Sequence, residues 1–175
     1  RLAGLKTYVG GNIGIPALDL LRDSTPDLYV LELSSFQLET TYSLNAHASV
    51  VLNISPDHMD RYSSLKDYVN TKKRIYSGQG LMVLNKDEEY IHSIIDSKRD
   101  TIYFSLGAPE GENFGLINHN NEVWLSQGNE KIINKNQLKI KGEHNISNAL
   151  AAMALAGAVN VPTNIMADVL KNFTG

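Results

Sequence analysis

The sequence predicts an α/β protein in which a mostly parallel sheet is flanked by helices and joined to a small antiparallel hairpin region. Up to Ser105, short apolar runs alternate with amphipathic stretches, which is typical of strands and helices that follow one another in turn. The run Ser49–Ile54 is apolar on both faces, as expected for a parallel strand that is covered on both sides. Between Glu112 and Lys141 the apolar residues alternate singly and are interrupted by polar turns such as 119–121, which predicts hairpins.

The same patterns place the individual elements along the chain. Strands are predicted at Thr7–Val9, Leu28–Leu33, Ser49–Ile54, Leu81–Asn85 and Thr101–Ser105. Helices are predicted near Pro16–Arg22, Ser64–Tyr76 and Glu88–Lys98, and after the hairpins at Ile146–Val159 and Asn164–Asn172. Pro162 ends the first of these last two helices, because proline cannot continue the helical hydrogen bonding.

Composition limits the class of protein. The 175 residues fit one domain, and a formal net charge of −3 argues against a nucleic-acid partner, which needs a clustered basic face. No run approaches the roughly 18 apolar residues of a membrane span and no signal-peptide pattern opens the chain, so we expect no membrane partner. The absence of cysteine excludes disulfides and thiolate metal sites, fits a cytoplasmic protein, and leaves oxygen and imidazole ligands that favour magnesium or manganese.

Both ends of the chain indicate a domain taken from a longer protein. Arg1 lies within what reads as a connection from a helix to a strand, and Gly175 follows directly on a helix. We therefore expect residues 1–175 to be a single domain of a larger enzyme.

Glu32 is the first candidate site residue. It stands near the end of a hydrophobic predicted strand and precedes the small hydroxyl residues Ser34 and Ser35. A carboxylate in this position holds magnesium in many nucleotide-hydrolysing α/β domains, since ligands bind beyond the carboxyl ends of parallel strands. A solvated or ion-paired glutamate at a strand end is the alternative.

A second polar cluster, Asp57, His58 and Asp60, follows the predicted strand Ser49–Ile54. Because carboxyl ends of parallel strands meet at one edge of a sheet, we expect this cluster to lie on the same edge as Glu32. Imidazole and carboxylate groups can bind a divalent cation or position a phosphate. A polar loop with a capping aspartate explains the same residues.

Lys72 occupies an unexpected place on the predicted helix Ser64–Tyr76. The helix opens on Ser64 and Asp67 as in a capping box, and its apolar stripe is completed at the position of Lys72. A lysine on an inward face is costly unless it is neutralised or paired, and a neutral amine can react with carbon dioxide to form a metal-binding carbamate. A snorkelling lysine, with a packed stem and an ammonium in water, is the simpler reading of the position.

Two further segments suggest ligand contacts. The turn 10–14 contains three glycines around Asn12, which permits close approach of the backbone to a ligand. In the segment 142–148, Asn145 is the expected N-cap of the alanine-rich helix. Asn148, one turn later, has no capping role and is free to contact the edge of a base.

The phosphate-binding motif G-x-x-x-x-G-K-[ST] is absent from the sequence. Glu32 therefore represents half of a nucleotide site without the loop that would hold the phosphates. Either the nucleotide hypothesis is wrong or that loop precedes Arg1.

In combination these segments resemble the Mur ligase family. The resemblance rests on Leu31–Glu39, Asp57–Tyr62, Lys72 within Thr-Lys-Lys-Arg-Ile-Tyr, and Gly142–Asn148, and it extends from about Tyr8 to Gly175. The residues of the first two segments are similar to those of the branch of the family that adds D-glutamate to UDP-N-acetylmuramoyl-L-alanine. The family has three domains, and the resemblance implies that this chain is the central one, with the phosphate-binding loop just before it and the closing domain just after it.

The resemblance also implies a role for each candidate residue. Glu32 corresponds to the ligand of the magnesium between the ATP phosphates. His58 and Lys72 correspond to the pair at a second magnesium, where the family's lysine is N-carboxylated and acts in catalysis. The remaining correspondences are substrate contacts at Asn12, Ser34 and Gln37 and nucleotide contacts at Asn145 and Asn148.

The implied reaction transfers a phosphoryl group from ATP to a substrate carboxylate, and the amine of D-glutamate then attacks the acyl phosphate. The resemblance implies ATP and magnesium as cofactors, small molecules as the only partners, a monomer, a cytoplasmic location and a role in peptidoglycan synthesis. Two alternatives remain. One is another ligase of the superfamily, such as a sister Mur ligase or folylpolyglutamate synthase, and the other is a non-catalytic nucleotide- or metal-binding module.

Overall fold

The computed structural model describes residues 3–21, 25–93 and 98–175, with the side chains of residues 91 and 92 excluded. The strands are β1 Thr7–Gly11, β2 Leu28–Glu32, β3 Ala48–Val51, β4 Leu81–Asn85, β5 Thr101–Phe104, β6 Phe114–His119, β7 Glu122–Gln127 and β8 Glu130–Asn134. The α-helices are α1 Ser35–Thr40, α2 Leu65–Lys73, α3 Glu143–Ala158 and α4 Thr163–Asn172. Short 3₁₀ helices are η1 Ala17–Leu21, η2 Arg74–Tyr76, η3 Glu89–Ser93 and η4 Lys135–Gln137.

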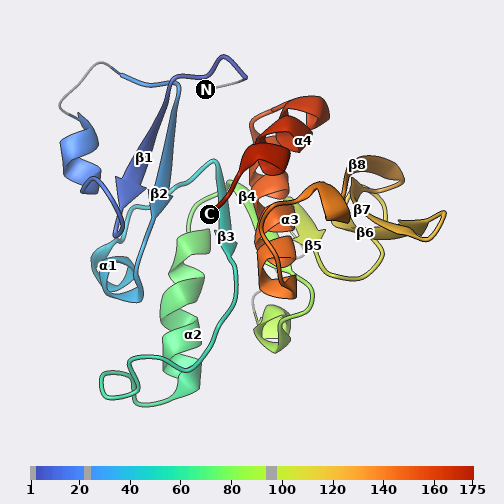
Figure 1. Cartoon of the computed structure of the whole chain (residues 1–175). Helices are drawn as coiled ribbons and strands as arrows, with labels where there is room; N and C mark the ends of the chain where they lie inside the picture. The colour runs from blue at the N-terminus through green and yellow to red at the C-terminus, as the bar shows by residue number, and fades with distance from the viewer. Residues whose placement is uncertain (1–2, 22–24, 94–97) are drawn as a thin grey trace.

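A six-stranded sheet in the order β3-β4-β5-β6-β7-β8 forms the centre of the molecule. The pairs from β3 to β6 are parallel and the pairs β6–β7 and β7–β8 are antiparallel, which confirms the predicted mostly parallel α/β fold with hairpins. The β6–β7 turn has positive φ at Asn120 (51°) and Asn121 (62°), as a two-residue hairpin requires. Figure 1 shows the hairpins at one side of the molecule and α3 across the sheet.

Both faces of the parallel part of the sheet are covered. On one face Val83 and Phe104 pack against α3, whose Leu150 is fully buried. On the other face Met82 and Leu84 pack against Tyr76 of η2. Strand β4 is therefore buried on both sides, which explains its continuous apolar run. No helix among the described residues is long and apolar enough to cross a membrane.

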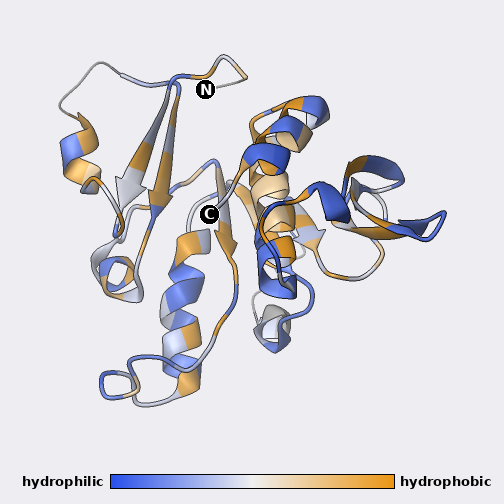
Figure 2. Ribbon diagram, in the orientation of Figure 1, coloured by the Kyte–Doolittle hydropathy of each residue, from blue (hydrophilic) through white to orange (hydrophobic). Residues whose placement is uncertain are grey.

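The strands β1 and β2 pair in parallel with each other, and in the described part of the chain they form a two-stranded sheet apart from the larger one. The expectation that all parallel strands share one sheet is therefore wrong. The apolar side chains on this pair are unusually exposed, among them Val9 (60%), Val30 (43%) and Leu31 (39%). Figure 2 shows hydrophobic residues along both strands.

Several predicted boundaries also differ. The strand expected at Ser49–Ile54 ends at Val51, and the helices expected near Pro16–Arg22 and Glu88–Lys98 are the short 3₁₀ turns η1 and η3. Arg22 and residues 94–97 lie outside the described residues. Helix α1 was not predicted. Only Leu20 of η1 is buried, so this segment lacks the packed apolar face that stabilises an α-helix.

Tyr76, which is buried, and Tyr90, which is partly buried, join β3 to the elements that cover the sheet. The Tyr76 hydroxyl accepts a hydrogen bond from the Val51 N–H (2.8 Å) and donates one to the Val83 carbonyl (3.0 Å). The Tyr90 hydroxyl donates to the Val51 carbonyl (2.9 Å). Burial raises the pKa of both phenols above the ordinary tyrosine value.

We expect Tyr76→Phe to lower the free energy of unfolding by about 1–3 kcal/mol, because the Val51 N–H loses its buried partner. The phenols also predict a pH dependence. Their folded-state pKa values lie above the unfolded value of about 10, so their contribution is complete below about pH 10 and is lost as the pH rises further. Urea unfolding at pH 8 and pH 10.5 measures both effects, and Tyr42→Phe, at an 82% exposed site, is the control. Equal stability of the two variants would contradict the assignment.

Candidate functional site

Glu32 lies at the carboxyl end of β2, as predicted, and its side chain is exposed. The glycine-rich turn 10–14 crosses the same strand end. The Asn12 N–H donates to the Glu32 carbonyl at 2.7 Å, and the Gly11 N–H donates to the Ile15 carbonyl at 2.8 Å. Gly11 has φ 119°, and a Cβ there would lie 2.2 Å from the Glu32 carbonyl oxygen. The structure thus brings Asn12 and Glu32 together through a contact that requires glycine.

Ser34 and Gln37 form a reciprocal capping box at the start of α1. The Ser34 hydroxyl accepts a hydrogen bond from the Gln37 N–H (3.3 Å), and Gln37 Oε1 accepts one from the Ser34 N–H (2.9 Å). The S-x-x-Q spacing is visible in the sequence and was the signal for the unpredicted helix. Both residues therefore have a structural role, and their substrate contacts stay a prediction.

His58 lies in the loop that follows β3, with an exposed side chain and a φ of 54°. Its N–H donates to Asp57 Oδ1 (2.8 Å), and its Nε2 is 3.4 Å from Asp57 Oδ2. Its ring lies 4.9 Å, centroid to centroid, from the ring of Phe36 on α1. These contacts fix the imidazole of His58 against Asp57 and Phe36.

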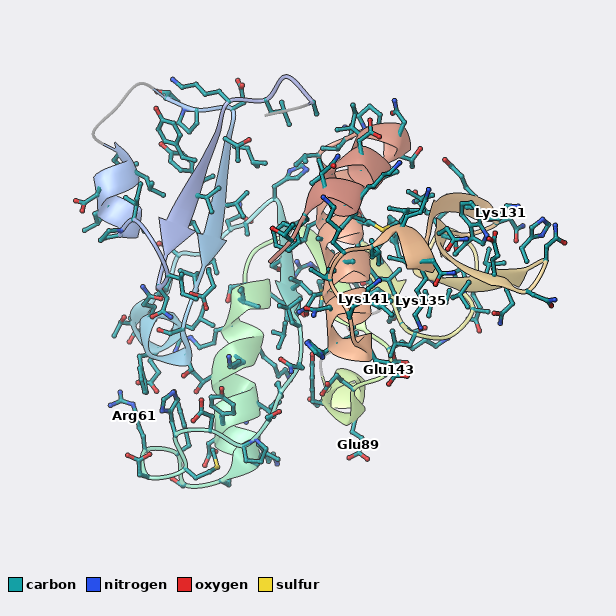
Figure 3. The ribbon with its side chains drawn as sticks, in the orientation of Figure 1. Arg61, Glu89, Lys131, Lys135, Lys141 and Glu143 are labelled. Carbon is teal, nitrogen blue, oxygen red and sulfur yellow. The ribbon has the colours of Figure 1, made fainter. Side chains whose placement is uncertain are left out.

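The loop is joined to α1 by a second contact. Arg61 forms a two-point ion pair with Glu39, and its guanidinium carbon lies 4.8 Å from the centroid of the Phe36 ring. Figure 3 shows Arg61 on the loop below α1. The hydrogen bond from Arg61 is the main cause that lowers the pKa of Glu39. The sequence interpretation did not identify Phe36, Glu39 or Arg61, because their contacts join distant segments.

Lys72 lies on α2 and is half-buried. The helix is capped by Ser64, whose hydroxyl accepts from the Asp67 N–H (3.2 Å), as predicted. The Lys72 Nζ lies 5.3 Å from the centroid of the buried Tyr68 ring. That position suits an ammonium packed on an aromatic face. It leaves both the snorkelling and the carbamate hypotheses open.

An aromatic contact connects Lys72 to the loop that carries His58. The ring of Tyr68 lies 5.1 Å from the ring of Tyr62, which is buried and close to the end of the loop. Helices α1 and α2 are also in contact. The segments of Glu32, His58 and Lys72 therefore adjoin one another.

The shared edge nevertheless differs from the predicted one. Glu32 belongs to the two-stranded sheet and His58 follows a strand of the six-stranded sheet, so strand pairing does not join them within the described residues. The arrowheads of β1, β2 and β3 point to the same end of the molecule in Figure 1. Glu32 is the last residue of β2, and the helix that follows it, α1, contacts His58 through Phe36.

The asparagines of α3 require a correction. The N-cap is Gly142 (φ 97°), so the helix begins at Glu143 and Asn145 is inside its first turn. The Asn145 side chain donates to the Lys141 carbonyl (2.7 Å) instead of capping. Glycine at the cap lets the helix start earlier than the Asn145 pattern suggested. Asn148 is exposed and lies three residues further, on the same face as Asn145.

The residues can supply part of a magnesium site. No group of three or more histidine, aspartate or glutamate side chains in the described ranges could hold a metal ion alone. Magnesium usually takes one or two carboxylates and completes its shell with water and substrate phosphates. The exposed Glu32 carboxylate fits that partial requirement.

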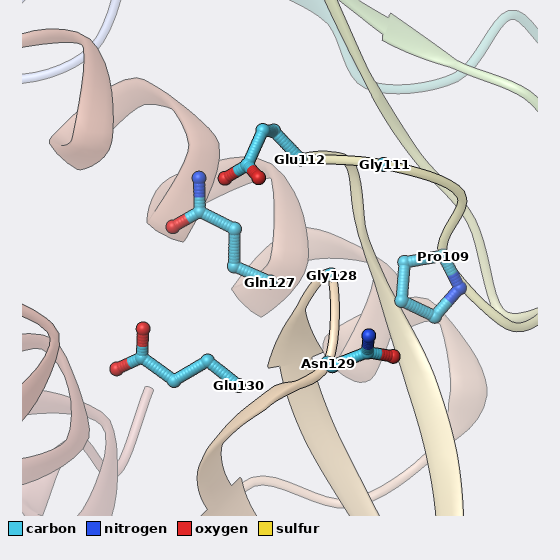
Figure 4. A pocket seen from close by; sticks show the side chains of 7 residues that line it. All are labelled: Pro109, Gly111, Glu112, Gln127, Gly128, Asn129 and Glu130. Atoms are coloured by element: carbon cyan, nitrogen blue, oxygen red, sulfur yellow. The ribbon is translucent and has the colours of Figure 1, made fainter.

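Two cavities lie away from these residues. One of about 410 Å³ is formed by hairpin residues that include Glu112, Gln127 and Glu130, and Figure 4 shows them around it. Another of about 380 Å³ lies between the helices α3 and α4 and the sheet strands β4 to β7. None of the predicted site residues lines either of these two cavities.

Comparison with known proteins gives a consistent family. The model of the Mur ligase middle domain matches residues 8–156. The chain is 49% identical over its whole length to a UDP-N-acetylmuramoylalanine–D-glutamate ligase of Nitrosococcus oceani and 46% identical to one of Methylobacillus flagellatus. In both cases the chain spans 39% of the relative's length.

Solved structures agree on the fold. A pseudomurein peptide ligase type C from Methanothermus fervidus aligns with a TM-score of 0.72 at 20% identity, over 99% of this chain and 45% of that one. A UDP-N-acetylmuramoylalanyl-D-glutamyl-2,6-diaminopimelate–D-alanyl-D-alanyl ligase from Acinetobacter baumannii aligns with a TM-score of 0.71 at 19% identity, over 98% of this chain and 41% of that one. At these identities the likeness shows the fold alone.

Proposed function

Because the chain belongs to the Mur ligase family, we propose that it is the central, ATP-binding domain of a ligase that adds D-glutamate to UDP-N-acetylmuramoyl-L-alanine. The observation that carries this proposal is the 42–49% identity, over 99–100% of the chain, to eight ligases of that name. The proposal includes ATP and magnesium as cofactors, no nucleic-acid or membrane partner, and a monomer that acts in the cytoplasm.

The exposed apolar surface supports the assignment to a larger protein. Soluble domains rarely expose many large apolar side chains together, and such surfaces are usually covered by a partner segment. Here Val9, Ile13, Ile15 and Leu18 are 53–78% exposed within one short stretch. The curated relatives are also more than twice as long as this chain. We propose that residues 1–175 pack against further segments of the intact enzyme.

The proposed reaction begins with phosphoryl transfer from ATP to the alanine carboxylate of the nucleotide substrate. The D-glutamate amine then attacks the acyl carbon, phosphate leaves with the electrons of the broken C–O bond, and the amine loses its proton. Bound magnesium would neutralise charge on the phosphates. Glu32 supplies a carboxylate for that cation, and His58 and a carbamylated Lys72 would hold a second one.

The other predicted residues would position substrates. Asn12, held by the Glu32 backbone, and the α1 residues Ser34 and Gln37 are proposed to contact the UDP-muramoyl group. Asn145 and Asn148 share one face at the start of α3 and are proposed to contact the adenine. The positive end of the helix dipole there favours a nearby anion.

Amino-acid-dependent phosphate release by the intact enzyme tests the proposal. With ATP, magnesium and UDP-N-acetylmuramoyl-L-alanine present, we expect one phosphate per amide formed with D-glutamate and none with L-glutamate, L-lysine or diaminopimelate. The 175-residue chain alone should show no turnover, since it lacks a loop for the phosphates. Preference for another amino acid would indicate a sister ligase. Turnover by the chain alone would contradict the domain assignment.

A further inference from the structure

The relative position of Glu32 and His58 presents a structural problem. In a single parallel sheet, strand hydrogen bonds would fix the distance between residues at neighbouring strand ends. Here β2 and β3 belong to different sheets within the described residues, so that constraint is absent. A metal site that uses both residues needs another device to hold them at a constant separation.

Helix α1 provides the connection. It begins at Ser35, with two residues between it and the end of β2, and its capping box fixes its direction. Phe36, on its first turn, contacts the His58 ring, with centroids 4.9 Å apart. A displacement of α1 therefore moves both Glu32 and the surface on which the imidazole lies.

The Glu39–Arg61 ion pair is a second contact between α1 and the loop that carries His58. Glu39 lies one turn after Phe36, and its side chain is only 27% exposed. Its carboxylate accepts hydrogen bonds from both Nε and Nη2 of Arg61. The Arg61 N–H in turn donates to the His58 carbonyl (2.9 Å), which joins the arginine to the backbone of the histidine. The Arg61 guanidinium also lies on Phe36, at 4.8 Å from its centroid.

We propose that Phe36, Glu39 and Arg61 form a clasp that sets the separation and orientation of Glu32 and His58. These three are positioning residues, and the inference rests on the proposed ligase function. An isolated ion pair on the surface contributes little to folding stability. The proposed role of the Arg61–Glu39 pair is therefore to position the two segments. The two-point Arg61–Glu39 geometry restricts rotation, which a single contact from lysine does not.

Substitution of the clasp in the intact enzyme tests the proposal by turnover. We expect Arg61→Met and Glu39→Gln each to lower kcat by about 10- to 100-fold and to raise the magnesium concentration for half-maximal activity, as loss of a residue that orients a metal ligand does. Arg61→Lys should fall between these variants and the wild type. The double variant should be no worse than the poorer single one, because the two side chains act as a unit.

The matched control is Lys86→Met, which removes the exposed Lys86–Glu110 pair (3.1 Å), an ion pair that shares no residue with the clasp. It should leave kcat and magnesium dependence unchanged, and the clasp variants should lower Tm no more than it does. Wild-type magnesium dependence in Arg61→Met would overturn the proposal. So would losses that multiply in the double variant, or a loss of activity that follows the loss of folded protein.

A second measurement needs no substrate and separates this proposal from the ligase assignment. Amide hydrogen exchange in segment 55–62 should be faster in Arg61→Met than in the wild type, with the rest of the chain unchanged. The chemical shifts of the His58 ring protons should change, because the ring moves relative to the Phe36 ring current. If both are unchanged, the clasp is wrong even when the enzyme is an active ligase. If both change in a protein without ligase activity, the clasp holds and the proposed function fails.

Discussion

Lys72→Ala in the intact enzyme is expected to lower D-glutamate-dependent turnover by at least about 10²- to 10³-fold, the loss typical of removing a group that stabilises transition-state charge. The expectation follows from the proposed carbamate, since alanine cannot provide an anion for a metal. Acetate or formate should restore part of the activity, because a small carboxylate can occupy the vacated space.

The two hypotheses for Lys72 predict different results when arginine replaces the lysine. Its side chain is half-buried and its Nζ lies 5.3 Å from the centroid of the Tyr68 ring. If Lys72 acts only as a packed ammonium, Lys72→Arg should keep most of the activity, because a guanidinium also stacks on aromatic rings. A carbamate cannot form on a guanidinium, so Lys72→Arg should be as inactive as Lys72→Ala if the carbamate hypothesis is right.

Turnover of these variants at equal folded concentration, with and without added acid, decides between the hypotheses. Lys66→Ala, at an exposed position of the same helix, is the control and should retain wild-type activity. Full activity of Lys72→Arg, with no effect of acetate or formate, would leave Lys72 as a packed snorkelling side chain.

Much of the central fold was predictable because local signals and burial agreed. Strand β4 was placed at its observed bounds, since a strand covered on both faces is apolar at nearly every position. The start of α2 was also predicted, because Ser64 and Asp67 form a cap from neighbouring residues. The hairpin turn at Asn120 and Asn121 depends on residue types that tolerate positive φ.

The errors arose where distant segments decide the outcome. No local pattern shows that β1 and β2 pair apart from the larger sheet, since strand partners depend on the whole chain. Helix α1 is short, and its S-x-x-Q cap was present in the sequence but was interpreted only as a substrate contact. The start of α3 was misplaced because Gly142, with φ 97°, can end the preceding turn before Asn145 is reached.

In the candidate site, too, local features were predictable and contacts between distant segments were not. Glu32 was correctly placed at the end of a strand and His58 in the segment after one, because short apolar runs mark strand ends. Their connection was not predictable, because the Arg61–Glu39 pair joins residues 22 positions apart and leaves no periodic signal. The roles of these residues in metal and substrate binding remain predictions.

Gly11→Ala is expected to cause the second large effect, because a methyl group there has no room. Gly11 has φ 119°, outside the region open to residues with a side chain, and the added Cβ would lie 2.2 Å from the Glu32 carbonyl oxygen. The turn 10–14 must therefore move away from β2, which breaks the 2.7 Å hydrogen bond between Asn12 and Glu32. We expect the substitution to combine backbone strain of about 1–3 kcal/mol with displacement of two proposed site residues.

Gly14→Ala separates the effect of backbone strain from the effect of displacing the proposed site residues. Gly14 also has positive φ (80°), but a Cβ at this position would meet nothing within 4 Å. It should therefore lower Tm through strain alone and leave KM for the UDP-muramoyl substrate unchanged. Gly11→Ala should lower Tm further, raise that KM and reduce kcat, because Asn12 and Glu32 are both displaced. Thermal unfolding and steady-state kinetics of the two variants measure this difference. Equal values of Tm and KM in the two variants would show that the turn does not position the site.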